Sequence, residues 1–364
     1  MQGNDWIMGL FKDYYSRNKK SIFNIEKREF GIGVWGRKIA KRHMAFFSDQ
    51  ELNAYLSSEP PLFISHSVAY YEFPDATPME KKNWQGAELV FDLDSPETSK
   101  EAMKIMKEEL KKLIEIIKDE FGARDMLIAF SGNRGYHLHV RDRGFLPMNS
   151  DDRKRIIEYV KAEGFDHKKM FEIFRKKRKD ELLKNPHMVP GPNPNNWGAL
   201  GRFARKSKEI FSADPLQLSR RLRDRKNLDS FLAGIDCGDW GRGHGQSEED
   251  LMQKLGPISE MIKVRCEIDQ AVTQDPTKLI RMPGSLHGST GLEVRILKEN
   301  EIGDFDPFSD AVVLPEDKTG ITLKEDVEIE MKGTKLSAKK GQRAKVPAFM
   351  AAYLYLKERA ELTS

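Results

Sequence analysis

The sequence AELVFDLDSPE, residues 87–97, closes an apolar run with two aspartates that are two positions apart. Residues 89–94 have the composition of a β-strand, and side chains i and i+2 of a strand point to the same face of its sheet. Asp92 and Asp94 are therefore expected side by side, where their negative charges repel each other. The stretch predicts a strand that ends in a pair of carboxylates on one face.

The spacing of the pair leaves two interpretations open. An isolated D-x-D is most often two solvated carboxylates at a strand end that cap the following helix. The alternative is a divalent-cation site, because Mg²⁺ and Mn²⁺ prefer oxygen ligands and their charge cancels the repulsion. Residues elsewhere in the chain have to decide between the two.

The segment after the pair predicts a strand–helix–strand–strand unit. Ser95 and Pro96 are typical of a helix start, because a hydroxyl can cap the helix and proline fits its first position. The helical apolar period continues to about Phe121. MLIAF and YHLHV, residues 126–130 and 136–140, then have the composition of strands. We expect the first two strands of this unit to lie in one sheet.

The rest of the chain divides by composition. A first amphipathic helix is predicted within DWIMGLFKDYYSRNKK, and strand character returns late in the chain at VRCEID, TKLIRMPG and GLEVRIL. Between them lies a charged helical region that VPGPNPNNWG interrupts, a loop that neither a helix nor a central strand could hold. We predict a mixed α/β fold with a core at 1–150 and 256–345, a basic helical insertion at 151–255 and a C-terminal helix at 346–364.

The net charge of +4 is unevenly distributed along the chain. Residues 151–230 contain 21 Lys and Arg against 12 Asp and Glu, a balance of +9, so the remainder sums to −5. A basic segment beside an acidic remainder indicates that a polyanion lies along one part of the molecule. A solvated helical face such as FRKKRKDELLK would give the same count, so charge alone leaves both possibilities open.

Length and composition exclude several classes of protein. The 364 residues, 39% of them hydrophobic, suffice for two or three domains or for one large core with insertions. No apolar run approaches the roughly 18 to 20 residues that span a bilayer, and the N-terminus lacks a secretory signal. Cys237 and Cys266 are the only cysteines, so disulfides do not organise the fold. We expect a reduced cytoplasmic protein that does not enter a membrane.

A second cluster of polar residues lies in SGNRGYHLHV, residues 131–140. Ser131 and the neighbouring glycines predict a tight turn whose backbone amides could face an anion. Arg134 projects from this turn, and His137 alternates with apolar residues on the following strand. An arginine and a histidine beside an aspartate pair favour a phosphate chain bound to a metal ion.

The third cluster is CEIDQAVTQDPTKLIRMPGSLHGSTGLEV, residues 266–294. Asp269 ends a short predicted strand and could supply a third carboxylate. Arg281 and His287 lie on either side of a Pro-Gly turn and could form a second phosphate clamp.

Together these clusters resemble the catalytic small subunit of the archaeal and eukaryotic DNA primases. VFDLD is similar to the family's aspartate motif, SGNRGYH to its Ser-Gly-x-Arg-Gly-x-His motif, and LIRMPGSLHGSTGL to its third motif. REF at 28–30 and FDPF at 305–308 also resemble family segments. The resemblance covers most of residues 20–315, and three motifs in this order and at this spacing are specific evidence.

The resemblance implies a primase catalytic core, with sheets flanked by helices, that makes short primers on single-stranded DNA by two-metal nucleotidyl transfer. Asp92, Asp94 and Asp269 would be the catalytic residues and would hold two Mg²⁺ or Mn²⁺ ions. The residues that would bind the incoming nucleotide are Ser131, Arg134, His137, Arg281 and His287, together with Glu29 and Arg42, where the family carries a glutamate and an arginine.

One departure from the family concerns zinc. The family usually has a zinc knuckle of cysteines and histidines near the catalytic core, commonly just after the aspartate strand. Here that region reads SPETSKEAMKIMKEEL and contains neither residue type. Cys237 and His244 could form only part of a site, so zinc is not expected.

The resemblance also implies partners, and the sequence leaves alternative functions open. The chain would form a heterodimer with a primase large subunit and would act on a single-stranded DNA template with NTPs or dNTPs. The nearest alternative is a primase-polymerase of the DNA-repair type. More distant alternatives are a D-x-D glycosyltransferase, which does not require the second and third motifs, and a non-catalytic nucleic-acid-binding protein.

Overall fold

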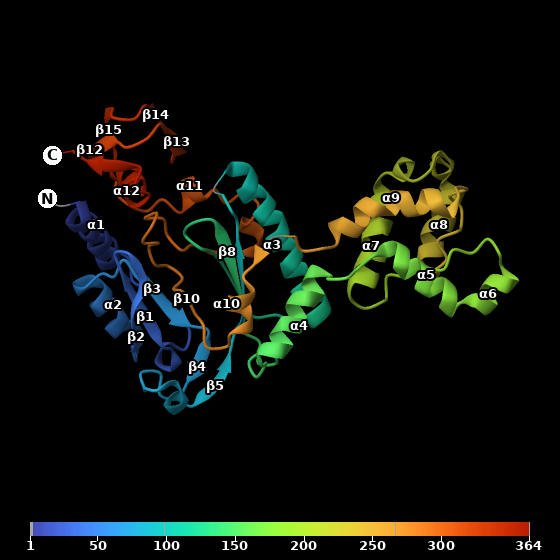
Figure 1. Ribbon diagram of the computed structural model, residues 1–364, viewed down its shortest axis with the longest axis horizontal. Helices are drawn as coiled ribbons and strands as arrows, with labels where there is room; N and C mark the ends of the chain where they lie inside the picture. Colours follow the sequence, from blue (N-terminus) through green and yellow to red (C-terminus); the bar gives the residue numbers. More distant parts are fainter. Residues whose placement is uncertain (1–2, 98, 266, 364) are drawn as a thin grey trace. The chain divides into compact units, whose positions relative to one another are not determined.

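The chain folds into two compact units (Figure 1). The computed structural model describes residues 3–97, 99–265 and 267–363. The first unit comprises Met1–Ile114, Ala123–Lys154 and Cys266–Ser364, and the second comprises Glu115–Gly122 and Arg155–Arg265. The helical insertion expected at 151–255 thus corresponds to a unit that runs on to Arg265 and includes the end of an earlier helix. Helices α3 (Lys100–Phe121) and α4 (Ser150–Lys161) each contribute residues to both units.

A five-stranded antiparallel sheet of order β11-β7-β8-β6-β9 is the centre of the first unit. Strand β6 covers Leu89–Asp94, as the apolar run predicted. The expectation that the second predicted strand joins it in one sheet is confirmed, although β8 lies between them because a tight turn makes β7 and β8 a hairpin. The other strands are β7 (Met126–Phe130), β8 (Gly135–Val140), β9 (Glu267–Ile268) and β11 (Ile296–Leu297).

Helix α3 begins later than the sequence predicted. Its first residue is Lys100, and the Oγ of Ser99 accepts a hydrogen bond from the backbone N–H of Ala102 at 3.2 Å. The capping hydroxyl is therefore that of Ser99, and the predicted start at Ser95 and Pro96 is wrong. The predicted end is confirmed, because the helix ends at Phe121 before Gly122, which has a φ of 74°.

A second sheet of order β10-β3-β1-β2 brings a late segment of the chain beside early ones. In the antiparallel pairing of β10 with β3, Arg281 lies opposite Ser65. Helix α1 confirms the predicted first helix, and a two-stranded sheet of β4 and β5 completes this region (Figure 1). The bounds are α1 Gly3–Arg17, β1 Phe30–Val34, β2 Arg37–Met44, α2 Asp49–Ser58, β3 Phe63–Ser67, β4 Ala69–Tyr71, β5 Trp84–Ala87 and β10 Leu279–Arg281.

The end of the chain corrects the predicted C-terminal helix at 346–364. Helix α12 covers only Ala348–Leu356, and the chain then returns as β16 (Ala360–Leu362) to pair with β12. The apolar run that buries the helix ends at Leu356, and Glu358 takes a positive φ of 61° that reverses the chain. The remaining elements here are α11 Pro307–Asp310, β12 Lys318–Leu323, β13 Val327–Met331, β14 Thr334–Ala338 and β15 Arg343–Pro347.

The second unit is helical, as its sequence predicted. Its core contains the fully buried Trp240, whose ring stacks on Phe203 at 5.6 Å between centroids. The proline-rich loop joins α6 to α7 and forms, among the described residues, one isolated bridge between Pro190 and Asp239. In the described part of the chain no helix is both long and apolar enough to cross a bilayer. The helices are α5 His167–Lys177, α6 Lys179–Lys184, α7 Gly198–Ala213, α8 Arg225–Cys237 and α9 Glu248–Met261.

Candidate active site

The aspartate pair lies in register with the histidine strand. Asp92 is opposite His137 and Asp94 is opposite Gly135 in the pairing of β6 with β8, so His137 and both carboxylates share one face of the sheet. The Nε2 of His137 lies 3.6 Å from the Oδ1 of Asp92. Asp269 follows β9 on the other side of β6, and its backbone N–H donates to the carbonyl of Asp92 at 2.9 Å. Strands β6 and β9 thus bring the three predicted carboxylates together, and β8 adds His137.

The ionised form of Asp92 is disfavoured in this arrangement. Burial raises the pKa of Asp92 to about 6; Arg281 opposes the shift, and the charges of Asp94 and Asp269 add to it. No described residue donates a hydrogen bond to this carboxylate. The nearest candidate, the Nε2 of His137, is 3.6 Å away, which is too long for a hydrogen bond. Within the described residues, the positive charge near Asp92 therefore does not offset the cost of burying its ionised carboxylate.

The other two carboxylates have partners within the protein. The Oδ2 of Asp94 accepts a hydrogen bond from Arg134 at 2.8 Å, and its Oδ1 accepts from the N–H of Ser95 at 3.0 Å. The Oδ1 of Asp269 accepts from the N–H of Val272 at 3.2 Å and so caps the short helix α10 (Gln270–Gln274). The first interpretation of the pair, a cap for the next helix, does not hold for α3, which Ser99 caps.

The donor set matches the chemistry of a hard divalent cation. Three carboxylates supply oxygen ligands, and the charge of a bound cation would favour the ionised form of Asp92. In the arrangement of the described side chains, no three His, Cys, Asp or Glu groups converge on one point as ligands of a single ion. Ligation by Asp94 and Asp269 would require their side chains to leave Arg134 and the N-terminus of α10.

The turn between β7 and β8 is built as the sequence predicted. The N–H of Ser131 donates to the carbonyl of Gly135 at 2.9 Å, and the Oγ of Ser131 accepts from the N–H of Gly135 at 3.2 Å. A Cβ at Gly135 would lie 1.8 Å from the carbonyl oxygen of Leu93, so only glycine allows β8 to start against β6. Ser131 thus holds the turn closed, and Arg134 reaches from it to Asp94.

Arg281 joins this turn from the second sheet. Its Nη1 donates to the carbonyl of Ser131 at 2.6 Å, across a wide gap in sequence. Burial lowers the pKa of Arg281, and the charges of Asp92 and Asp94 oppose that shift. The guanidinium is therefore bonded to the turn and lies within the electrostatic influence of the aspartates.

His287 packs against the same turn. The Oγ1 of Thr290 donates to the carbonyl of Gly132 at 2.6 Å, and a Cβ on Gly132 would lie 2.7 Å from the Cβ of His287. Burial, followed by the charges of Arg281, Lys357 and Lys38, lowers the pKa of His287 well below its usual range. His287 is therefore a neutral imidazole surrounded by cations in this structure.

His137 is also neutral. Burial and the nearby charge of Arg281 lower its pKa well below the usual range. Its buried Nδ1 has no hydrogen-bond partner in the described structure. A neutral ring opposite Asp92 does not compensate that carboxylate with a positive charge.

Glu29 and Arg42 form a separate cluster. The Nε of Arg42 donates to the Oε1 of Glu29 at 2.9 Å, and the Nζ of the buried Lys82 lies 3.6 Å from Oε2. Among the described residues, no hydrogen bond or ion pair joins this cluster to the three aspartates. The structure therefore does not bring these two predicted residues into direct contact with the rest of the site.

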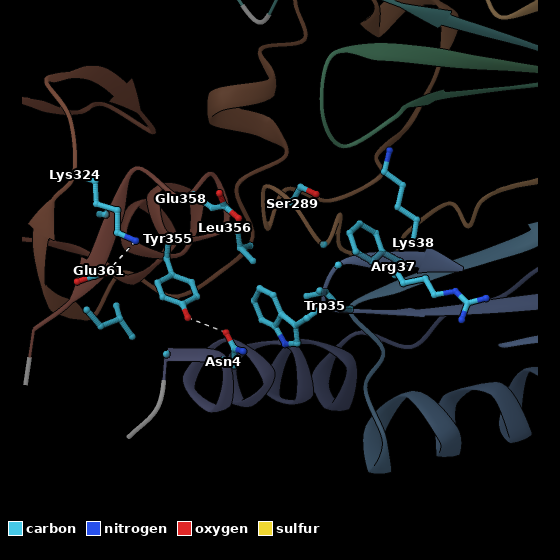
Figure 2. A pocket seen from close by; sticks show the side chains of 17 residues that line it. Asn4, Trp35, Arg37, Lys38, Ser289, Lys324, Tyr355, Leu356, Glu358 and Glu361 are labelled. Atoms are coloured by element: carbon cyan, nitrogen blue, oxygen red, sulfur yellow. Dashed lines mark hydrogen bonds and ion pairs between the residues drawn. The ribbon is translucent and has the colours of Figure 1, made fainter. Parts of the chain in front are cut away.

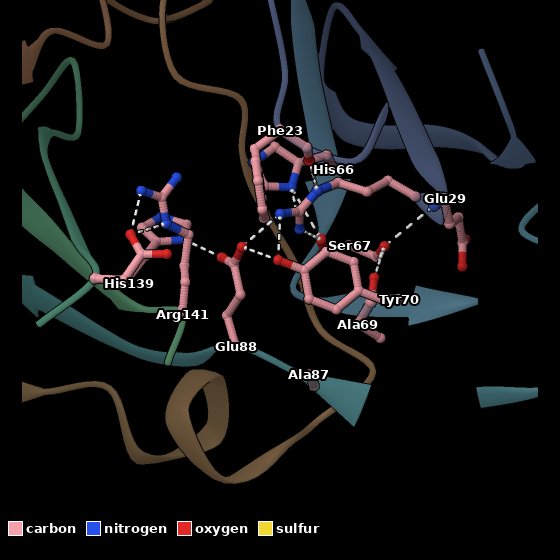
Figure 3. Close-up of polar contacts among 12 residues, drawn as sticks. Phe23, Glu29, His66, Ser67, Ala69, Tyr70, Ala87, Glu88, His139 and Arg141 are labelled. Atoms are coloured by element: carbon pink, nitrogen blue, oxygen red, sulfur yellow. Dashed lines mark hydrogen bonds and ion pairs between the residues drawn. The ribbon is translucent and has the colours of Figure 1, made fainter. Parts of the chain in front are cut away.

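A buried polar network lies next to the site (Figure 3). Glu88, which directly precedes β6, accepts hydrogen bonds from Tyr70 at 2.7 Å and from the buried Arg28, and its Oε2 lies 2.7 Å from the Nδ1 of His139. Burial alone would raise the pKa of Glu88, but the charge of Arg28 and the bond from His139 hold it well below its usual range. The network joins the start of β6 to the end of β8, at the opposite end of their pairing from Asp94 and Gly135.

Two lysines of the site were missed by sequence reasoning. The charge of Lys38, on β2, affects the pKa of both Asp92 and His287. Lys357 follows α12, and its Nζ donates to the Oδ1 of Asn133 in the turn at 2.9 Å. Neither lysine belongs to a motif, so no signal in the sequence could have selected them.

The fold and the site define a class of protein: a mixed α/β protein in which paired carboxylates, arginines and neutral histidines face one another across the edge of a sheet. A family model described as DNA primase small subunit matches residues 91–297. The chain belongs to the DNA primase small subunit family. The matched region contains the three aspartates and both arginines of the site, but not Lys38, Lys357 or the Glu29 cluster.

Relatives named DNA primase small subunit match along nearly the whole chain. That of Picrophilus torridus is 33% identical over 375 residues, which is 96% of this chain and 96% of the relative. That of Methanocella arvoryzae is 30% identical and covers 99% and 98%, and that of Methanothrix thermoacetophila is 29% identical and covers 98% of each. A solved polymerase domain of Mycobacterium tuberculosis ligase D in complex with DNA aligns over 82% of this chain and 83% of that chain, with a TM-score of 0.36 and 12% identity. A likeness of that size carries no argument.

Proposed function

We propose that this chain is the catalytic subunit of a replicative DNA primase and synthesises short primers on single-stranded DNA. The observation that carries the proposal is the meeting of three family motifs at one place. Asp92 on β6 lies opposite His137 on β8, and Arg281 from the other sheet is bonded to the turn that starts β8. These residues lie within the region that matches the family model.

Asp92, Asp94 and Asp269 would hold two divalent cations, Mg²⁺ or Mn²⁺. When bound, such ions lower the pKa of an attacking hydroxyl and neutralise the charge on the triphosphate and the leaving pyrophosphate. To ligate an ion, Asp94 would leave its hydrogen bond with Arg134, and Asp269 would leave its hydrogen bond with the N–H of Val272. Zinc is not part of the proposal.

The incoming triphosphate would be bound from two sides of the turn. Arg281 comes from β10 and Arg134 from the turn itself, and a planar guanidinium can donate to two phosphate oxygens at once. Ser131 keeps the turn closed through its hydrogen bonds with Gly135. His287 supports the clamp as a neutral ring beside Gly132. Glu29 and Arg42 would lie at the edge of the nucleotide site.

The test of the function is primer synthesis with and without a partner subunit. We expect divalent-ion-dependent incorporation of labelled nucleotide on single-stranded DNA, measured with NTPs and with dNTPs, and none after chelation. We expect the chain alone to extend a supplied primer well but to initiate poorly, and a cognate large subunit to bind it and restore initiation. Efficient unaided initiation without binding of the large subunit would contradict the heterodimer, and incorporation that ignores the template would contradict the primase itself.

Arg281→Ala or Arg134→Ala is expected to raise the apparent KM for nucleotide. The loss of transition-state stabilisation should be roughly 2 to 4 kcal/mol, because each arginine would meet the triphosphate directly. Affinity for single-stranded DNA and its dependence on salt should stay unchanged, because template binding would rest on other phosphate contacts. The measurement is steady-state kinetics beside an equilibrium DNA-binding titration.

The matched control for these variants is Arg17→Ala. Arg17 is 74% exposed on α1 and pairs with Asp13 at 3.0 Å, so its removal should leave both readouts unchanged. If the Arg281 and Arg134 variants lost DNA affinity while their KM for nucleotide held steady, the clamp would belong to the template strand.

A further inference from the structure

Two lysines from opposite ends of the chain act electrostatically on His287. Lys38 lies on β2 just after the turn of the β1–β2 hairpin, and Lys357 follows the last residue of α12. The positive charges of both lysines, with that of Arg281, act on the buried ring of His287. The site therefore gathers more positive charge than the arginines of the motifs supply.

Lys38 has no partner of opposite charge. It is exposed, and within the described residues its side chain makes neither a hydrogen bond nor an ion pair. Figure 2 shows its side chain extending away from Trp35 of the same hairpin. Lys38 lines the same groove as Phe63, whose ring contacts His287, so its free ammonium group is available to an anion near that histidine.

Lys357 is held in position beside like charges. Its Nζ donates to Asn133, the neighbour of Arg134, and lies 5.9 Å from the centre of the Tyr353 ring. Burial lowers the pKa of Lys357, and the charges of Arg134 and Arg359 lower it further. No carboxylate pairs with it in the described part of the structure, so an anion between Lys357 and Arg134 would relieve the repulsion.

A groove of about 710 Å³ is lined by Lys38 and by Leu356 and Glu358, the two neighbours of Lys357 in sequence (Figure 2). Lys38, Phe63 and Ser289 line its inner end, where the ring of Phe63 meets His287 edge-on at 5.9 Å. The C-terminal side carries Glu358 and Glu361, and Glu361 pairs with Lys324 at 3.0 Å. Because carboxylates line that side, the groove does not favour a nucleic-acid strand along its whole length. Of the described cations that line the groove, Arg37 and Lys38 of the β1–β2 hairpin have no carboxylate partner, whereas Lys324 has one.

We propose that Lys38 and Lys357 bind the polyphosphate of the incoming nucleotide. This rests on the proposed function and adds two residues that no motif contains. Lysine suits this role because its compact charge can approach phosphate oxygens in any orientation, whereas each arginine offers a fixed fork. The two lysines would meet the part of the polyphosphate that Arg134 and Arg281 leave free.

The test measures equilibrium binding of ATP, AMP and inorganic tripolyphosphate in the presence of Mg²⁺. Lys38→Met and Lys357→Met should each weaken binding of ATP and tripolyphosphate by roughly 10-fold and leave AMP unchanged. In primer extension KM for nucleotide should rise by a similar factor, and Lys357→Arg should recover most of the loss. Lys324→Met, which removes a lysine of the same groove that is paired with Glu361, is the matched control and should change nothing.

A structural role for Lys357 gives a different result. Asn133→Ala removes the hydrogen bond but keeps the charge, so it should weaken tripolyphosphate binding much less than Lys357→Met does. If Asn133→Ala and Lys357→Met lost tripolyphosphate binding equally and had equally lowered unfolding temperatures, the proposal for Lys357 would be overturned. Unchanged tripolyphosphate binding in Lys38→Met would overturn the proposal for Lys38. Because this assay needs no primer synthesis, a chain that makes no primers but loses tripolyphosphate binding in the lysine variants would refute the function and leave this inference standing.

Discussion

Asp92→Asn will reduce nucleotide incorporation by roughly 1,000-fold, and Asp94→Asn by a similar factor. Each substitution keeps the shape of the side chain and removes one negative charge from the proposed cation site. Binding of single-stranded DNA should not change. Incorporation assays across a range of Mg²⁺ and Mn²⁺ concentrations measure the loss, and near wild-type rates in either variant would refute the assignment of metal ligands.

The same substitution at Asp92 should stabilise the chain in the absence of metal. The pKa of Asp92 is raised from 3.8 to about 6, so its ionised form destabilises the fold above pH 6. We expect Asp92→Asn to raise the free energy of unfolding at pH 7 by roughly 1 to 3 kcal/mol, and the gain to vanish as the pH falls from 6 towards 3.8. Denaturant titrations in a chelator measure this, with Asp13→Asn, at a carboxylate that is 45% exposed, as the control. A destabilised Asp92→Asn variant would mean that the carboxylate has a protein partner.

Arg28→Met should lower the free energy of unfolding by roughly 3 to 5 kcal/mol. Arg28 and Glu88 are each 2% exposed and form an ion pair. Arg28 also donates to the carbonyls of Phe23 at 2.9 Å and Ser67 at 2.6 Å. Without the guanidinium, Glu88 stays buried with a charge that Tyr70 and His139 do not neutralise. Denaturant unfolding at pH 7 checks this expectation.

The pH dependence of the loss identifies its cause. The pKa of Glu88 lies well below 4.5 in the folded chain, so the pair stabilises the fold above that pH and the stabilisation is lost as the pH falls through the folded pKa. The difference between wild type and Arg28→Met should therefore shrink in acid. Arg225→Met, which removes an 85% exposed partner of Asp229, should cost less than about 1 kcal/mol. A loss of that small size in Arg28→Met would contradict the role of the buried pair.

Local patterns predicted the parts of the site that depend on neighbours in sequence. Alternation along β6 put Asp92 and Asp94 on one face, and the Ser-Gly turn predicted the hairpin that presents Arg134 and His137. The helical period predicted the character of the second unit and the end of α3. The predicted start of α3 was wrong because Ser95 and Ser99 are both capping residues, and sequence could not decide which of them meets a free N–H.

Only the tertiary structure decided how distant segments meet. Arg281 reaches Ser131 because β10 pairs with β3. The C-terminal helix is shorter than predicted because the residues after it pair with β12 as strand β16. Lys38 and Lys357 have no local signal, since a lone lysine acquires a role only from the charges that packing places around it. Periodicity and turn chemistry are set by adjacent residues and can be read along the chain, whereas the field at Asp92 and His287 is a sum over side chains that the sequence keeps far apart.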